Sequence, residues 1–83
     1  GRFVLIHAHE PGECRRVFAA WRGFESPLRH SVALASCEHG EHRIWWTVEA
    51  DSKQAALAML PEFVAKRTDA ARVTEVVLPE TGG

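Results

Sequence analysis

The sequence predicts an α+β domain with four strands and two helices, in the order strand, helix, strand, strand, helix, strand. Runs rich in β-branched and aromatic residues alternate with two segments whose apolar residues recur at helical spacing. The 83 residues are enough for one small core and leave no room for a second. Hydrophobic residues make up 46% of the chain and charged residues 25%, which is typical of a folded globular domain.

The first half of the pattern contains three strands and one helix. Residues 2–9, RFVLIHAH, predict the first strand because β-branched and aromatic side chains favour a pleated surface. Four apolar residues then recur on one helical face: Cys14, Val17, Phe18 and Trp21. Residues 29–37 predict the second strand and residues 42–50 the third, and the hairpin loop between them offers Gly40 for a positive φ.

The second half predicts a capped helix and a last strand. Asp51 or Ser52 caps a helix whose inner face carries four apolar residues: Ala56, Leu60, Phe63 and Val64. Pro61 lies inside this pattern, and it predicts a kink or break near residues 57–59 because proline removes a backbone hydrogen bond. Residues 71–78 predict the last strand. The order is that of the split βαβ or ferredoxin-like arrangement, an antiparallel-type sheet of order 4-1-3-2 with both helices on one face.

The last six residues, LPETGG, differ in character from the rest of the chain. They resemble a sortase recognition motif, but a sorting signal would continue with an apolar segment and basic residues. We therefore expect one domain over residues 1–78 and a flexible tail over residues 79–83. An engineered tag or ligation scar is our interpretation of this tail, with chance as the alternative.

Charge and cysteine content narrow the classes of partner and compartment. The formal net charge is −1, so the chain has no basic footprint for nucleic acid. No apolar run approaches the roughly 18 residues of a membrane span. With only two cysteines, we expect reduced thiols in a cytoplasm, and a single disulfide is the alternative.

The two faces of the predicted sheet are both apolar. We expect Val4, Ile6 and Ala8 of the first strand to face the helices, together with Ile44, Trp46 and Val48 of the third. The opposite face then carries these residues: Phe3, Leu5, His7, His9, Trp45, Thr47 and Glu49. An exposed apolar patch on this face would mark an interface or a ligand pocket. We expect Trp45, Thr47 and Leu5 to line such a pocket. The simplest cover is a second copy of the sheet, which predicts a homodimer.

In element order and in this two-faced sheet, residues 2–78 resemble the dimeric α+β-barrel superfamily. That superfamily includes small monooxygenases, isomerase-like proteins and small nickel-binding proteins. The resemblance implies a small ligand bound between sheet and helices or between two sheets. It does not imply one chemistry, because function depends on the site and not on the fold.

His7 and His9 are two residues apart, so both rings leave the same face of the first strand. We take the first and third strands to run parallel at the centre of the sheet, which would bring Glu49 beside the two histidines. Two imidazoles and a carboxylate are suitable ligands for zinc, nickel or non-haem iron. The same trio would also serve as an acid–base pair with an orienting carboxylate. A solvated His9 and an interface hydrogen bond from His7 are the alternative.

A second, weaker cluster crosses the predicted hairpin, where Cys37, His39 and His42 form a C-x-H-x-x-H run. A tight turn would bring two of them onto one metal, at the end of the sheet opposite His7 and His9. We interpret Cys14 as a small buried hydrophobe, with a reactive thiol at a helix N-terminus as the alternative.

The sequence therefore favours a small soluble protein that binds a metal or small ligand at the His7/His9 strand end and the open sheet face. A small oxygenase or isomerase that needs little cofactor is one alternative. An assembly or regulatory module without catalysis is the other, so whether the protein is an enzyme stays open.

Overall fold

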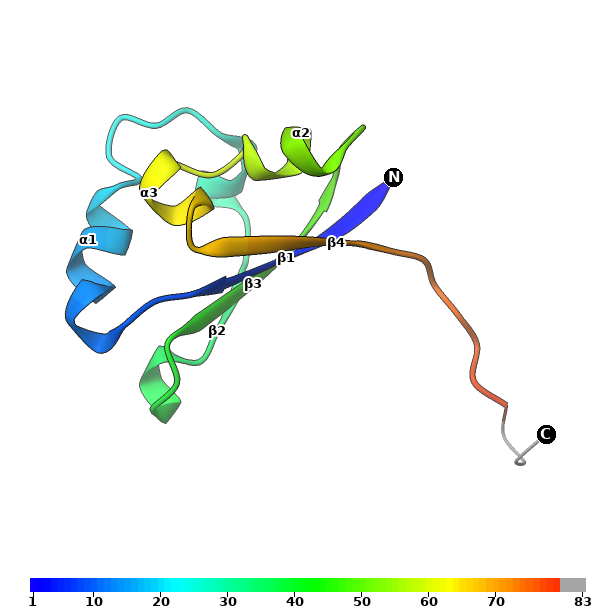
Figure 1. Ribbon diagram of the computed structural model, residues 1–83, viewed down its shortest axis with the longest axis horizontal. Coiled ribbons are helices and arrows are strands. Elements are labelled where there is room, and N and C mark those ends of the chain that lie inside the picture. The colour runs from blue at the N-terminus through cyan, green and yellow to red at the C-terminus, as the bar shows by residue number, and fades with distance from the viewer. Residues whose placement is uncertain (80–83) are drawn as a thin grey trace.

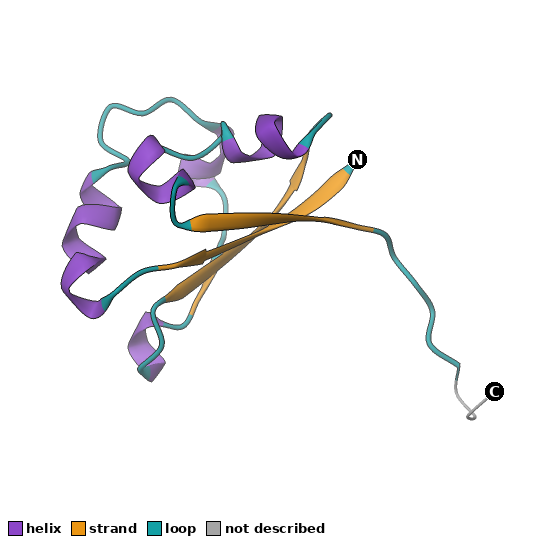
Figure 2. Cartoon of the chain, viewed as in Figure 1, coloured by secondary structure: helices purple, strands orange, loops and turns teal. Residues whose placement is uncertain are grey.

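The computed structural model describes residues 1–79 of the chain, and it shows an α+β architecture as predicted (Figures 1 and 2). The predicted tail lies mostly outside the described residues, which end before Glu80. The regular elements are β1 (Arg2–Ala8), α1 (Cys14–Ala19), β2 (Leu34–Ala35), β3 (Arg43–Glu49), α2 (Lys53–Leu57), α3 (Glu62–Ala65) and β4 (Thr68–Val73). Three 3-10 turns connect them: η1 (Pro11–Glu13), η2 (Pro27–His30) and η3 (Cys37–His39).

The four strands form one antiparallel sheet with neighbours in the order β2-β3-β1-β4, which reads β4-β1-β3-β2 from the other edge. At its centre, Arg2 of β1 lies opposite Glu49 of β3, and His7 lies opposite Ile44. The expectation that the first and third strands run parallel is therefore wrong. The hairpin after β2 reverses the chain, so β3 starts beside the end of β1 and ends beside its beginning.

The helices cover one face of the sheet (Figure 1). The sequence explains where α2 begins and where it ends. The Ser52 hydroxyl caps α2 by accepting a hydrogen bond from the Ala55 amide at 3.0 Å. The break predicted at Pro61 is confirmed, since α2 ends at Leu57 and α3 begins at Glu62. None of the helices within residues 1–79 has the length and apolarity that a membrane crossing requires.

Two strands differ from their predicted bounds. The segment predicted as the second strand opens with η2, because the Ser26 hydroxyl accepts a hydrogen bond from the Leu28 amide and fixes a turn there. Only Leu34–Ala35 then pairs with β3. The last strand lies earlier than predicted because β1 offers partners only from His7, opposite Thr68, to Arg2, opposite Val73.

The core lies between the sheet and the helices. Phe3, Leu5 and His7 of β1 are buried there, and so are three residues of β3: Ile44, Trp46 and Val48. The prediction for β3 is confirmed, but that for β1 is wrong: Phe3, Leu5 and His7 face the helices, and Val4, Ile6 and Ala8 lie on the other face. Both faces of β1 are largely apolar, so the sequence pattern did not distinguish the buried face from the open one. An error of one residue in the assignment exchanges the two faces.

Candidate metal centre

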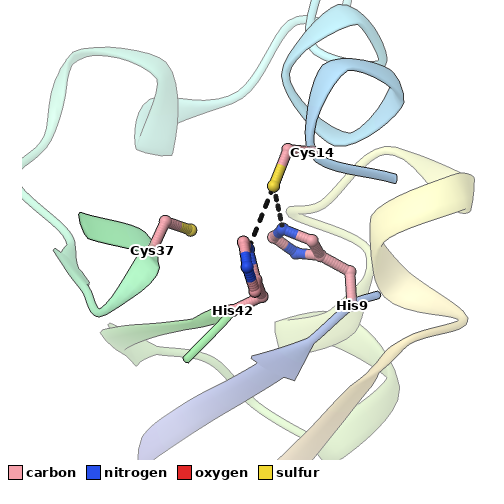
Figure 3. Close-up of side chains that lie close together, drawn as sticks. All are labelled: His9, Cys14, Cys37 and His42. Atoms are coloured by element: carbon pink, nitrogen blue, oxygen red, sulfur yellow. Dashed lines mark hydrogen bonds between the residues drawn. The ribbon is translucent and has the colours of Figure 1, made fainter. Parts of the chain in front are cut away.

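Among the described residues, four side chains with metal-binding atoms converge where β1 ends and β3 begins (Figure 3). They are His9, Cys14, Cys37 and His42. Each offers one ligand atom, and these atoms all lie within 4.8 Å of one another. All four side chains are half-buried, so the group lies at the edge of the core and not on the open surface.

The antiparallel ladder places the two histidines of this group side by side. Beyond the last regular pair of β1 and β3, the His9 amide donates a hydrogen bond to the His42 carbonyl at 3.0 Å. The ladder therefore continues through His9 and His42, and their ring centroids lie 5.4 Å apart.

Two tight turns bring the cysteines to the same point. After β1, the Glu13 amide donates to the Glu10 carbonyl at 2.9 Å, and this turn places Cys14 at the first position of α1. On the other side, the His39 amide donates to the Ser36 carbonyl at 2.9 Å, which closes η3 around Cys37. The centre therefore joins two short stretches of the chain, residues 9–14 and 37–42.

The thiol of Cys14 makes direct contacts within this centre. Its Sγ lies 3.0 Å from Nδ1 of His42 and 3.3 Å from Nε2 of His9 (Figure 3). Burial raises the pKa of the Cys37 thiol, and the neighbouring Cys14 raises it further. Without a cation, Cys37 is therefore a protonated thiol at neutral pH, and a bound metal ion would reverse that preference.

Behind His9 lies a fully buried polar side chain, His7. Its Nε2 is 2.9 Å from Nδ1 of His9, and its Nδ1 is 3.0 Å from the Thr68 hydroxyl. Burial lowers the pKa of His7, and the nearby His9 lowers it further. Burial likewise lowers the pKa of His9, with a further contribution from His42. Both imidazoles are therefore neutral at pH 7, the form in which a histidine binds metal.

An ion pair fastens the segment that leads into Cys14. The Glu13 carboxylate accepts hydrogen bonds from Nη2 and Nε of Arg67, at 2.9 and 3.1 Å. These bonds hold the pKa of the Glu13 carboxyl below its ordinary value. Because Glu13 is committed to Arg67, the donor set of the centre consists of thiols and imidazoles.

The spacing of the four ligand atoms is close to that of a tetrahedral metal site, and binding one ion would need only small shifts. Zinc binds sulfur at about 2.3 Å and imidazole nitrogen at about 2.0–2.1 Å, which sets ligand atoms roughly 3.3–3.8 Å apart. The longest separation here is no more than 4.8 Å, so closure requires a shift of about 1 Å. Two thiolates would balance the charge of a divalent cation and leave a neutral centre at this half-buried position.

The structure brings together only two of the three residues in the first predicted metal site. His7 and His9 lie on the same face and contact each other, as their spacing predicts. Glu49 does not join them: it lies opposite Arg2, at the far end of β1, with its side chain 72% exposed. Its predicted position followed from the parallel pairing, so it is corrected together with that pairing.

The second predicted cluster contributes two residues. Cys37 and His42 belong to the centre, whereas His39 is exposed and lies outside the group. The two clusters predicted at opposite ends of the sheet share one end, because β1 and β3 are antiparallel.

Cys14 is the member of this group that the sequence interpretation did not assign to a metal. A spacing signal is present in the sequence: H-x₄-C over residues 9–14 is mirrored by C-x₄-H over residues 37–42. Both gaps fall within the range of zinc-ligand pairs.

The predicted ligand pocket is divided between the two faces of the sheet. Leu5 is fully buried under the helices, opposite Trp46. Trp45 and Thr47 alternate with Trp46 along β3 and lie on the other face. The three side chains therefore do not line one pocket.

Comparison with protein-family models, curated proteins and solved structures gave no match to this chain. The functional interpretation therefore depends on the geometry of the centre.

Proposed function

We propose that this protein binds one zinc ion through His9, Cys14, Cys37 and His42. The observation that carries the proposal is the convergence of four ligand atoms within 4.8 Å from two distant stretches of the chain, residues 9–14 and 37–42. Two soft thiolates and two imidazoles form a donor set that zinc prefers. Non-haem iron, which was also considered from the sequence, is less suited because its enzymes keep open coordination positions.

The role that follows is structural. Four protein ligands fill a tetrahedral shell, whereas a catalytic zinc ion keeps one position for water or substrate. The ion would join the ends of β1 and β3 to α1 and η3. A small domain gains from such a link, because its apolar core alone supplies little stability.

The enzymatic alternative in which His7 moves a proton has less support. The His7 ring is fully buried, and its two nitrogens lie within hydrogen-bond distance of His9 and Thr68. A general acid or base must reach its substrate, and this ring is enclosed by protein.

We also propose a ferredoxin-like fold and a homodimer. The β-α-β-β-α-β order and the helices on one face support a ferredoxin-like arrangement. The apolar open face supports a homodimer of the dimeric α+β-barrel type. A reducing compartment such as the cytoplasm would keep Cys14 and Cys37, which form no disulfide, available to the metal.

Elemental analysis combined with native mass spectrometry tests the zinc proposal. The reduced full chain is purified without chelators, equilibrated with zinc and desalted. We expect one zinc ion per chain. His42→Ala should lose it, whereas the matched control His39→Ala, three residues away and outside the group, should retain it.

Substitution with Co²⁺ keeps the test informative if a variant folds poorly. Charge-transfer absorption from thiolate to Co²⁺ counts the sulfur ligands, so Cys14→Ser and Cys37→Ser should each remove about half of the intensity, since each removes one of two thiolates. A parent protein that binds no zinc would overturn the proposal. Equal loss of zinc in His39→Ala and His42→Ala would overturn it too.

A further inference from the structure

We infer that His7 and Thr68 are positioning residues that hold His9 in the tautomer whose Nε2 is free to bind the metal. This inference rests on the proposed zinc site and deepens it. The chain of contacts runs from the Val64 carbonyl through Thr68, His7 and His9 to Cys14. For Thr68, His7 and His9 in turn, only one placement of the hydrogen allows hydrogen bonds to both neighbours in this chain.

The first step fixes the hydrogen of Thr68. Its hydroxyl lies 2.7 Å from the Val64 carbonyl, which can only accept a hydrogen bond. The single hydroxyl hydrogen is therefore donated to Val64. The Thr68 oxygen is left with lone pairs, so it accepts from any further polar neighbour.

The second step fixes His7. Its Nδ1 lies 3.0 Å from the Thr68 oxygen and must be the protonated nitrogen, because that oxygen has no hydrogen left to donate. The ring is fully buried, and burial disfavours a charged imidazolium. A neutral imidazole carries one hydrogen, so Nε2 of His7 is an acceptor.

The third step fixes His9. Its Nδ1 lies 2.9 Å from the accepting Nε2 of His7, so Nδ1 carries the hydrogen. Nε2 of His9 then has a lone pair, and this is the nitrogen that lies 3.3 Å from Cys14 in the metal centre. The ligand atom is unprotonated before any metal arrives.

Nε2 of His9 is therefore ready to bind a metal ion without first losing a proton. A histidine with the opposite tautomer would have to move a proton before Nε2 could bind. Metal ligation also makes the Nδ1 hydrogen more acidic, which strengthens its bond to His7. Partners of this kind behind metal-binding histidines typically contribute about 10–100-fold to metal affinity.

The test uses the full chain, with Thr68→Val as the main variant and Thr68→Ser as its matched control. Valine keeps the shape of threonine and removes the acceptor, whereas serine keeps the hydroxyl. Long-range ¹H–¹⁵N NMR of the reduced, metal-free protein reports which nitrogen of each imidazole carries the hydrogen. Competition with a chromophoric chelator gives the zinc affinity.

We expect His7 and His9 of the parent both to carry the hydrogen on Nδ1. Thr68→Val should shift His9 toward the Nε2–H form and weaken zinc binding about 10–100-fold. Thr68→Ser should keep the parent tautomer and affinity. His7→Gln offers an amide oxygen near the position of Nε2, so it should bind zinc more tightly than His7→Ala.

The outcomes separate this inference from the zinc proposal. A parent that binds zinc while His9 carries its hydrogen on Nε2 would overturn the inference alone. So would a Thr68→Val variant with unchanged tautomers and affinity. A parent that binds no zinc would overturn the proposed function and the ligand role of His9 together, whatever its tautomers.

Discussion

At the scale of single residues, Cys37 would make the proposed zinc binding depend on pH. Burial raises the pKa of its thiol in the metal-free protein, so at neutral pH a metal must displace a proton to bind there. As the pH falls, protons compete more strongly with the metal. We expect the zinc affinity to fall at least about tenfold per pH unit between pH 8 and 6, since one displaced proton gives this slope. Competition titrations at several pH values measure it, and a flat profile would contradict Cys37 as a thiolate ligand.

The residue scale also shows what the sequence could predict about the site. The period of two along a strand correctly puts His7 and His9 on one face, because that inference needs only local geometry. Cys14 fits both a buried position on the apolar face of a helix and a metal site. The helical spacing of the apolar residues alone therefore favoured a place in the core. The predicted position of Glu49 was wrong because it assumed that β1 and β3 run parallel, although the predicted hairpin after the second strand reverses the chain and makes them antiparallel.

At the scale of elements, Arg67 links η1 to the connection between α3 and β4. Its guanidinium binds Glu13, donates to the Phe63 carbonyl at 3.0 Å, and stacks 3.7 Å from the centroid of the Phe63 ring. We expect Arg67→Ala to lower the free energy of unfolding by about 1–2 kcal/mol through the lost stacking and carbonyl bond. Lys66→Ala is the matched control, because its ion pair with Glu62 is exposed. Urea unfolding at neutral pH measures both, and equal losses would contradict the link.

The Glu13 part of this link has a defined pH dependence. Because Arg67 lowers the pKa of the Glu13 carboxyl, the ion pair stabilises the fold above the ordinary carboxyl pKa. That contribution is lost as the pH falls through the lowered folded-state pKa. The stability difference between the parent and Glu13→Gln should therefore shrink on acidification, as paired urea titrations would show. A difference that grew at acid pH would contradict this ion pair.

Elements were predictable where one local rule dominates. Pro61 breaks a helix whatever surrounds it, and the break occurs where expected. The second strand is shorter than predicted because the turn that starts at Ser26 and Pro27 continues through His30, into a β-prone run. The limits of β4 depend on how far β1 extends beside it, which is a property of the sheet and not of residues 68–78.

At the scale of the whole molecule, zinc should stabilise the fold by binding only to the folded state. At a free zinc concentration 100 times the dissociation constant, linkage gives about 2.7 kcal/mol. For a domain of this size, that corresponds to a rise of roughly 10–20 °C in the thermal midpoint. Circular dichroism with and without a chelator measures the shift, and it should be clearly smaller for Cys14→Ser, because that variant keeps only three of the four ligands. An equal rise in that variant would point to nonspecific binding of zinc.

The open face of the sheet leads to the last prediction, a homodimer. Val4 and Ile6 of β1 and Trp45 of β3 lie on the face that the helices leave uncovered, and Leu34 at its edge is 71% exposed. The described chain beyond β4 adds exposed apolar side chains at Val76, Val77 and Leu78. A second copy related by a two-fold axis would cover the open face, because each sheet would meet the other.

Sedimentation velocity at micromolar concentration tests this assembly. We expect a dimer for the parent and a monomer for Trp45→Glu, since a charge at the centre of the face would be buried without a partner. Arg22→Glu is the matched control and should leave the dimer intact, because Arg22 is exposed in the turn after α1, and α1 lies on the covered side of the sheet (Figure 1). The zinc content of Trp45→Glu should equal that of the parent, because the four ligands come from one chain. A monomeric parent would show that the open face stays in water, and the zinc site would still stand as a property of the single chain.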